Sequence, residues 1–403
     1  KAAAPLCDNG LLFVNGKDYL AGLDAYNGTL LWERHEPGSG RMAMHKDCGN
    51  LATADGVLYA AVDSRCLAIE GRTGATQAAW SVPGLPPDQA HWGYIAVIDD
   101  LVLGSATPPE AKLIPTIKAD YGVVWYHHQP VITSRALFAL RRTDGTTAWT
   151  YTPPRGAILN ATLTVLDGLL CFVESTQATT LTHPTGKIPL KELFEGGPEL
   201  VAIEVASGRQ RWRQPIDLDD FHHTIFMAGS QGSLVLTGTR HADVNGKTLI
   251  QYQLVGIRAA TGQEAWRNDN TPTKADILNG GHGEQTQHPA IVGDVIYGSG
   301  FARRLHDGTP HPGWSWQKSP QGASLSASTH CAFSRQGGNP TVADWTRGSQ
   351  LPLTRVTRPG CLINTIPASG IVAIPEASSG CTCPYPVQTS LALCPRLPPT
   401  PPP

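Results

Sequence analysis

The side chains best suited to metal chemistry lie in one glycine-rich run, residues 279–289. His282 and His288 stand in it, and Glu284 or His306 would complete a ligand set for a transition metal, because imidazole and carboxylate groups bind such ions. The separation of the two histidines matches no short-range ligand motif. The alternative is a loop in which glycine permits tight turns and His288 hydrogen-bonds a neighbouring sheet. The metal candidates are therefore His282 and His288.

Cysteines form the second reactive set. The chain has nine, and none stands in a CxxC motif. This number predicts disulfides and an oxidising compartment, with one thiol left over. The candidate pairs are Cys48 with Cys66, Cys7 with Cys394, and a staple among Cys361, Cys381 and Cys383. A bridge closing a loop of about 20 residues would contribute about 3 kcal/mol. The alternative role for the last three is copper or zinc binding together with His330.

A repeated tryptophan unit indicates which elements carry these residues. A glycine precedes a tryptophan by the same short step several times, with a period of roughly 50 residues, which is typical of repeat architectures. The pairs are Gly28/Trp32, Gly145/Trp149, Gly208/Trp212 and Gly262/Trp266, with a looser copy at Gly74/Trp80.

A second repeated signal is a polar or glycine pair followed by an apolar strand. Such pairs favour the positive-φ turns that fold one strand onto the next. The copies begin at Asn9-Gly10, Asp55-Gly56, Asp99-Asp100, Asp167-Gly168, Gln231-Gly232, Gly293-Asp294 and Ser369-Gly370. The segment 331–334 fits as a degenerate copy, and the total is then eight.

These two signals together predict an all-β protein, an eight-bladed β-propeller with seven blades as the alternative. One small sheet cannot bury both faces, whereas radially arranged sheets bury them against their neighbours. The tryptophans would fill the gaps between blades. Separate β-sandwiches are the competing interpretation. We expect a single propeller domain over 1–394, with insertions near 105–133 and 176–198, and a proline-rich tail over 395–403.

Composition excludes several classes of partner. The 31 basic and 33 acidic residues nearly balance, so no overall field recruits nucleic acid or anionic membrane. No apolar run is long enough for a transmembrane segment. The chain begins at Lys1 without a signal core, and we expect a mature or truncated product of a secreted or periplasmic protein.

The repeat units resemble the tryptophan-docking repeats of the quinoprotein, PQQ-dehydrogenase-like eight-bladed propellers. Residues 279–289 and the segments 358–361 and 380–383 are also similar to a bacterial PQQ-like repeat subgroup of largely unassigned function. The resemblance implies, for the catalytic members, PQQ stacked between a tryptophan and a disulfide of adjacent cysteines, beside calcium held by Glu, Asn and Asp. No two cysteines are adjacent in this sequence, and no aspartate base matches a family motif.

We therefore expect a non-catalytic secreted or periplasmic propeller with no catalytic residues assigned. Its partner is a protein or another copy of itself, bound as a scaffold or assembly subunit, because loops inserted into a rigid fold usually carry recognition. The alternatives are a PQQ-like quinoprotein oxidoreductase with PQQ and Ca, and a propeller that binds a metal or redox cofactor.

Overall fold

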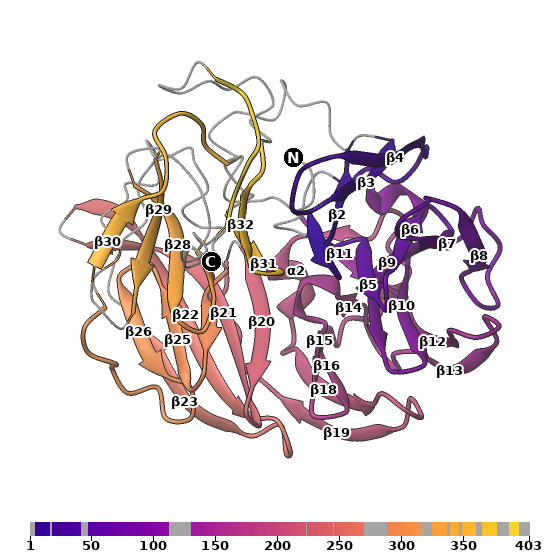
Figure 1. Ribbon diagram of the computed structural model, residues 1–403. Coiled ribbons are helices and arrows are strands. Elements are labelled where there is room, and N and C mark those ends of the chain that lie inside the picture. The colour runs from indigo at the N-terminus through magenta and orange to yellow at the C-terminus, as the bar shows by residue number, and fades with distance from the viewer. Residues whose placement is uncertain are drawn as a thin grey trace, which may run out of the picture.

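The computed structural model describes residues 5–16, 18–41, 47–112, 130–222, 224–244, 246–269, 288–314, 316, 325–336, 339–345, 349–359, 365–376 and 387–394. Strands dominate this part of the chain, and the prediction of an all-β protein is confirmed. The strands form eight antiparallel sheets arranged around a central axis (Figure 1). None of the described helices is both long enough and apolar enough to span a bilayer.

The first three sheets each have four strands. Sheet 1 comprises β1 (Leu6–Asp8), β2 (Leu11–Asn15), β3 (Tyr19–Asp24) and β4 (Leu30–His35). Sheet 2 comprises β5 (Leu51–Ala54), β6 (Val57–Val62), β7 (Arg65–Glu70) and β8 (Thr76–Ser81). Sheet 3 comprises β9 (His91–Ile98), β10 (Leu101–Thr107), β12 (Ala136–Arg141) and β13 (Thr147–Tyr151).

Sheet 4 is larger because inserted elements join it. Its strands are β11 (Val131–Ser134), β14 (Ile158–Leu159), β15 (Thr164–Leu166), β16 (Leu169–Glu174), β17 (Lys187–Ile188), β18 (Glu199–Glu204) and β19 (Gln210–Pro215). The helices among the described residues are two 3-10 turns, Pro109–Lys112 and Asn160–Thr162, and the short α1 (Ala178–Leu181) and α2 (Leu190–Phe194).

Of the remaining sheets, sheets 5 and 7 have four described strands each, and sheets 6 and 8 have three each. Sheet 5 comprises β20 (Ile225–Ser230), β21 (Ser233–Val244), β22 (Lys247–Arg258) and β23 (Glu264–Asp269). Sheet 6 comprises β24 (Ala290–Val292), β25 (Val295–Gly298) and β26 (Phe301–Arg304). Sheet 7 comprises β27 (Ser326–Ala327), β28 (Cys331–Gln336), β29 (Asn339–Asp344) and β30 (Ser349–Pro352). Sheet 8 comprises β31 (Ile366–Ala368), β32 (Ile371–Ile374) and β33 (Leu391–Leu393).

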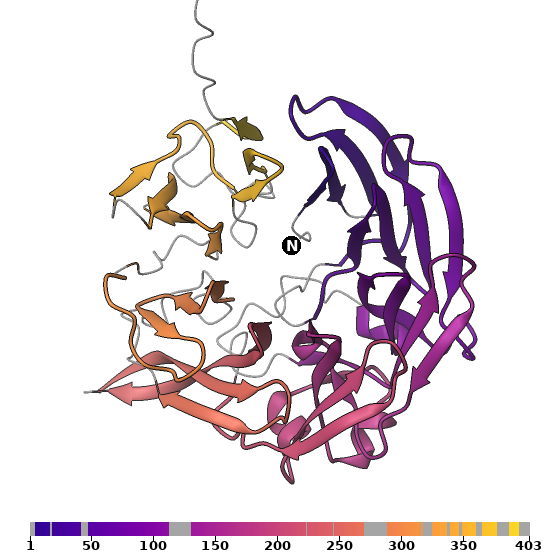
Figure 2. The same cartoon turned by 60° about the horizontal axis from the view of Figure 1, so that its bottom comes forward.

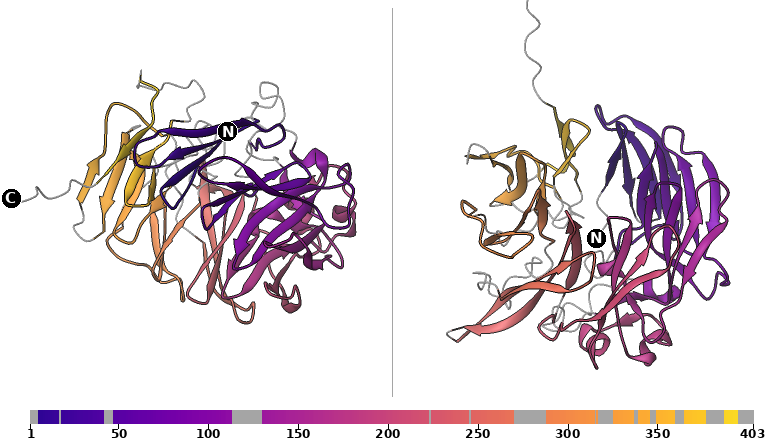
Figure 3. Two further views of the ribbon diagram at one scale, coloured as in Figure 1. Left: turned by 45° about the vertical axis from the view of Figure 1, so that its right-hand side comes forward. Right: turned by 90° about the horizontal axis from the view of Figure 1, so that it is seen from below.

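The sheets follow one another around the axis in chain order, so the first and last sheets come side by side (Figure 2). The first strands of successive sheets contact each other near the axis, as β5 contacts β9 and β24 contacts β27. Apolar clusters fill the spaces between sheets, and one of them joins sheets 4 and 5 through residues such as Cys171, Leu236 and Val255. The same radial order is visible from two further directions (Figure 3).

The predicted polar hairpin turns are present. Asn9, Asp55, Asp99, Asp167, Gln231 and Ser369 all have φ near +50°. Each begins a two-residue connection between antiparallel strands, for example between β1 and β2. Asparagine, aspartate and glycine tolerate this left-handed backbone, which explains why the sequence signal located the hairpins correctly.

The indoles lie between neighbouring sheets, each against the glycine turn of the next repeat. Trp32 Nε1 donates to Gly71 O at 2.8 Å, and the Trp32 ring covers Gly74. The same arrangement joins sheets 3 to 4, 4 to 5 and 5 to 6. There the indoles of Trp149, Trp212 and Trp266 donate to Val205 O, Ala259 O and Leu305 O at 2.7, 2.9 and 3.0 Å. We call each such contact a tryptophan dock.

The looser copy of the repeat, at Trp80, makes the same kind of contact from a shifted position. Its side chain is half-buried, and its ring lies against Gly145 in the turn before β13 of sheet 3. Ala78 holds the regular position four residues after Gly74, and Trp80 stands two residues further along β8, opposite Cys66. Residues two apart on a strand share a face, so the indole still reaches the next turn. Trp80 therefore contacts the turn of the next sheet from a position two residues later in its strand than the other docked tryptophans.

Candidate functional site

Within the described residues, the structure does not bring the predicted metal ligands together. His282 and Glu284 lie outside the described residues. His288 is an exposed residue. Its imidazole ring lies against the ring of Phe226, with 3.4 Å between the ring centroids. His306 Nδ1 is 2.9 Å from Ser233 Oγ. Within the described ranges, no group of three His, Cys, Asp or Glu side chains is placed to hold a metal ion.

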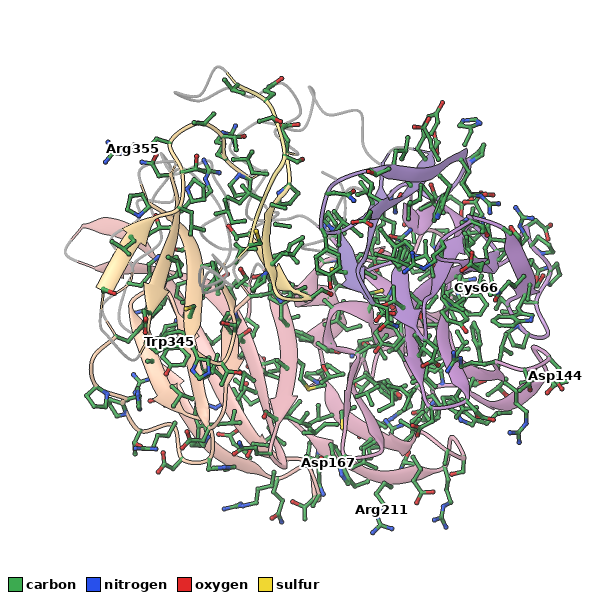
Figure 4. The ribbon with its side chains drawn as sticks, viewed as in Figure 1. Cys66, Asp144, Asp167, Arg211, Trp345 and Arg355 are labelled. Carbon is green, nitrogen blue, oxygen red and sulfur yellow. The ribbon has the colours of Figure 1, made fainter. Side chains whose placement is uncertain are left out.

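The predicted disulfides Cys48–Cys66 and Cys7–Cys394 are not formed. The six described cysteines all have free thiols. Cys66 lies in β7 with its side chain buried between sheets 2 and 3 (Figure 4), whereas Cys48 lies in the connection between β4 and β5. Cys7 Sγ instead donates to Ser369 Oγ at 3.4 Å. Cys361, Cys381 and Cys383 are outside the described residues, so their staple remains a prediction.

The two predicted insertions meet and form one structure. Strand β11 begins within the segment 105–133, and it pairs with β17 of the segment 176–198, Val131 opposite Ile188. Thr133 N and Oγ1 both donate to Gly186 O at 3.0 Å. We call β11 together with residues 176–198 the inserted lobe. The sequence located its two halves but gave no sign that they pair.

The inserted lobe is fixed to the scaffold by apolar packing. Helix α2 packs into the core shared by sheets 4 and 5 through its buried residues Leu190, Leu193 and Phe194. Helix α1 is held by Thr180, whose Oγ1 accepts a 2.8 Å hydrogen bond from Ala157 N. The opposite surface of the lobe, which includes Thr179 and Lys191, is exposed. The lobe is therefore a firmly supported surface directed to solvent, which suits recognition.

A buried polar cluster lies where the connection between β4 and β5 meets sheets 3 and 4. Ser134 Oγ at the end of β11 is 2.8 Å from Ser105 Oγ and 2.6 Å from Asn160 Oδ1. Asn160 Nδ2 donates to Asp47 Oδ1 at 3.0 Å. Arg41 Nη1 lies 3.6 Å from Asp47 Oδ2. We call Arg41, Asp47, Cys48, Ser105, Ser134 and Asn160 the inner polar cluster.

The inner polar cluster ties the connection between sheets 1 and 2 to the inserted lobe. Arg41 is 5% exposed, and its Nη2 also donates to Trp92 O. Burying a charged side chain is costly unless it is paired, and Asp47 supplies that pairing. Two buried donors, Arg41 Nε and Trp92 Nε1, have no acceptor in the part of the chain described. Open buried donors of this kind are where a water or a ligand oxygen binds.

The protonation of the cluster argues against a nucleophilic role for its thiol. Burial, with the charge of Asp47 adding to it, raises the pKa of the Cys48 thiol well above its usual value. Burial also raises the pKa of the nearby Tyr94 hydroxyl. Reactive cysteines need a lowered pKa and access. Cys48 is therefore a protonated hydrogen-bonding group at neutral pH, and the cluster fastens the connection between β4 and β5 to sheets 3 and 4.

A second polar network joins sheets 3 and 4 nearer the rim. Glu174 is fully buried, and Arg213 Nη1 donates to it at 2.9 Å. Tyr151 Oη donates to Glu174 Oε2 at 2.7 Å, and Arg213 Nη1 also donates to Glu199 Oε2 at 2.5 Å. Arg155 completes the pairing of Glu199. Every charge in the network has a partner, which indicates a structural fastening.

Comparisons with known proteins agree with this architecture. Residues 138–308 match the family model described as outer membrane protein assembly factor BamB. The crystal structure of BamB from Moraxella catarrhalis superposes with a TM-score of 0.50 at 14% identity, covering 92% of each chain. No curated protein matches this chain.

Quinoprotein dehydrogenases are also structurally similar. The quinohemoprotein alcohol dehydrogenase from Comamonas testosteroni has a TM-score of 0.56 at 13% identity, covering 93% of this chain and 70% of that one. A europium-containing methanol dehydrogenase has a TM-score of 0.52 at 12% identity, covering 92% and 81%. At these identities the likeness establishes the fold, a β-propeller. The chain is therefore similar to the PQQ-like repeat β-propellers in its fold and, over residues 138–308, in its sequence.

Proposed function

We propose that this chain is a non-catalytic periplasmic or secreted scaffold that binds a protein partner within an assembly. The observation that carries the proposal is the inserted lobe, because its two halves pair through β11 and β17 and its helix α2 is buried in the core. A rigid platform with an exposed surface is suited to recognising another protein. The match of residues 138–308 to a family described as an assembly factor supports the same class of role.

The periplasmic or secreted location is supported by that family description more than by the cysteines. The six described thiols are free, so they give no support for an oxidising compartment. The absence of an apolar run of transmembrane length in the sequence agrees with a protein that acts beside a membrane without crossing it.

The quinoprotein alternative requires an indole face, a disulfide of adjacent cysteines and calcium ligands. At the inner ends of the sheets, Trp92 is fully buried and packs edge-on against Phe138 with 4.8 Å between ring centroids. The carboxylate of Asp47 is already bound by Arg41 and Asn160. These residues do not fit a quinone with calcium, and no redox step is derived from them.

Two measurements test the proposal. An absorbance spectrum and metal analysis of the native protein should show neither a quinone nor a stoichiometric metal, and finding either would contradict it. The second compares Thr179→Arg, on the exposed face of α1, with Thr150→Arg, an exposed control in β13. A partner cross-linked to the native protein should be lost from the first variant and kept by the second. Equal retention by both would contradict recognition by the lobe.

A further inference from the structure

A histidine side chain closes the turn that joins α1 to β17 in the inserted lobe. His183 Nδ1 accepts a hydrogen bond from Gly186 N at 3.2 Å, and Thr185 Oγ1 lies 3.4 Å from the same nitrogen. A backbone N–H can only donate, so Nδ1 is an acceptor here and carries no proton. The imidazole is therefore held in its neutral form, with its proton on Nε2.

The same turn attaches the lobe to the chain beside it. Gly186 O accepts hydrogen bonds from Thr133 N and Thr133 Oγ1, and the pairing of β17 with β11 continues directly from there. At the other end of the turn, Arg135 Nη2 donates to His183 O at 2.8 Å. The turn, residues 183–186, is thus anchored at both ends to the segment that runs from β11 into β12. The bond to the imidazole closes the span between these two anchors.

Gly186 leaves this turn little freedom to adjust. Its φ is +63°, a left-handed conformation that suits glycine, and a Cβ built on it would lie 2.8 Å from the ring of Pro108. Gly186 is buried, and a buried backbone N–H is costly to leave without an acceptor. Loss of the bond to His183 should therefore open the turn, so that water reaches the Gly186 N–H.

Charged side chains on the elements around the turn oppose a further positive charge. Arg135 contacts the carbonyl of His183 itself, and Lys187 follows the turn as the first residue of β17. Glu110, in the 3-10 turn after Pro108, interacts with Lys187. These two cations and one carboxylate make the surroundings net positive, so a protonated imidazole would be repelled from its present position.

We propose that His183 is a pH-sensitive switch of the inserted lobe. Histidine is the side chain whose charge ordinarily changes between about pH 5 and 8. When the imidazole is protonated, both ring nitrogens become donors, so Nδ1 no longer accepts from Gly186 N and two N–H groups face each other. The turn then opens, and the pairing of β17 with β11 loses its anchor at Gly186 O. His183 is half-buried, so protons from solvent reach its ring.

The switch would regulate the recognition surface, and this consequence rests on the proposed function. Helix α1 ends directly before the turn, since His183 N donates to Thr180 O at 3.4 Å. Opening of the turn therefore releases the exposed face of α1 from its support. A partner bound to that face should be held less tightly below about pH 6 than at neutral pH.

Hydrogen exchange of the full chain alone tests the switch without any partner. After correction for the intrinsic exchange rate, the Gly186 amide should lose at least tenfold of its protection between about pH 8 and pH 5.5. The Gly208 amide is the internal control and should keep its protection, because it donates to a backbone carbonyl, Glu204 O, at 2.8 Å. Unchanged protection of Gly186, or loss of protection at both glycines together, would overturn the proposal.

Three variants separate the acceptor from the charge. His183→Asn keeps an acceptor, because its Oδ1 stands where Nδ1 is, but does not titrate, so Gly186 should stay protected at both pH values. His183→Ala removes the acceptor, and Gly186 should be unprotected at both. His222→Asn removes an exposed histidine outside the lobe and should keep the wild-type response.

A pH response that persists in His183→Asn would assign the switch to another group and overturn the proposal. Hydrogen exchange is measured here on the chain by itself. A partner that does not bind the lobe would therefore contradict the proposed function and leave this switch standing, whereas a flat exchange profile would contradict the switch alone.

Discussion

The two halves of the ring are joined by different means. From sheet 1 to sheet 6, an indole from each outer strand lies against the glycine turn of the next sheet, as Trp149 does on Gly208. Beyond sheet 6 this pattern stops, and an aromatic cluster lies between sheets 6 and 7. Tyr297 lies 5.1 Å from Trp314 and 4.3 Å from Trp345 between ring centroids. This contact is made by several rings, of which Tyr297 is buried and Trp314 and Trp345 are half-buried (Figure 4).

This difference shows what the dock contributes beyond apolar burial. In a regular dock, one indole nitrogen meets one carbonyl at a fixed place in the turn, so these interfaces share one geometry. In the aromatic cluster, Trp314 Nε1 donates to Gly298 O within its own sheet, and Trp345 Nε1 donates to Ser328 O. Those hydrogen bonds satisfy the rings without joining neighbouring sheets. We infer that the regular half is held by specific contacts and the irregular half by packing.

The largest expected effect is the loss of a docked indole. Trp212→Ala removes a side chain that is 9% exposed and leaves Ala259 O without its donor, and we expect unfolding free energy to fall by about 3–5 kcal/mol. Trp314→Ala in the aromatic cluster should cost about 1–2 kcal/mol, since neighbouring rings retain part of the packing. Denaturant unfolding measures both. Equal losses would show that docks and cluster are energetically equivalent.

Two glycine turns sharpen the comparison, because an indole covers Gly262 whereas no atom of the described residues lies within 4 Å of a Cβ built on Gly28. Gly262→Ala introduces a Cβ that would lie 2.5 Å from the Trp212 ring, at a residue with φ +74°. Overpacking and left-handed strain together should cost about 2–4 kcal/mol. Gly28→Ala carries the strain alone, and we expect about 1 kcal/mol. Because the backbone conformations match, the difference between the two unfolding free energies reports the indole, and a difference near zero would contradict the dock geometry.

A smaller and pH-dependent effect should come from the network between sheets 3 and 4. Burial raises the pKa of the Glu199 carboxyl, but hydrogen bonds from Arg213 and Arg155 outweigh it, so the folded pKa lies below the ordinary value. The resulting stability is present above the unfolded pKa and is lost as pH falls through the folded pKa. Unfolding free energy measured from pH 7 to about 3 should therefore decline more steeply for wild type than for Glu199→Gln. Glu33→Gln, an exposed residue of β4, controls for the removal of one charge.

The regular part of the fold was predictable because its signals are local. A positive-φ residue such as Asp167 must be tolerated by its own backbone, and Gly28 and Trp32 are separated by one turn. The sequence analysis placed each tryptophan in the gap between neighbouring blades. The structure places it against the glycine of the next sheet, so that Trp212 covers Gly262. A sixth acceptor turn, at Gly308, was missed because no tryptophan follows it at the regular step.

The candidate site was less predictable because its residues are distant in sequence. Asn160 bonds Asp47 across more than a hundred residues, and β11 pairs with β17 from another insertion. No periodicity connects such partners. The only available signal was the presence of two insertions, which located the lobe but not its pairing. The cysteine prediction failed for a related reason, since spacing does not show that Cys66 is enclosed between sheets.

The smallest expected effect separates a buried thiol from a bridge in the regular half. Cys66 is fully buried, and burial alone raises the pKa of its thiol far above the ordinary value. Cys66→Ala removes only the packing of one sulfur atom, and we expect a cost of about 1 kcal/mol. If Cys66 were bridged to Cys48, the loss would be about 2–5 kcal/mol and would match that of Cys48→Ala. Denaturant unfolding of both variants, with and without reductant, distinguishes the cases, because a free thiol gives the same midpoint in either condition. The contrary result is a wild-type midpoint that shifts with reductant while the midpoints of both variants do not. It would show that a Cys48–Cys66 disulfide forms, in the part of the ring that the tryptophan docks also stabilise.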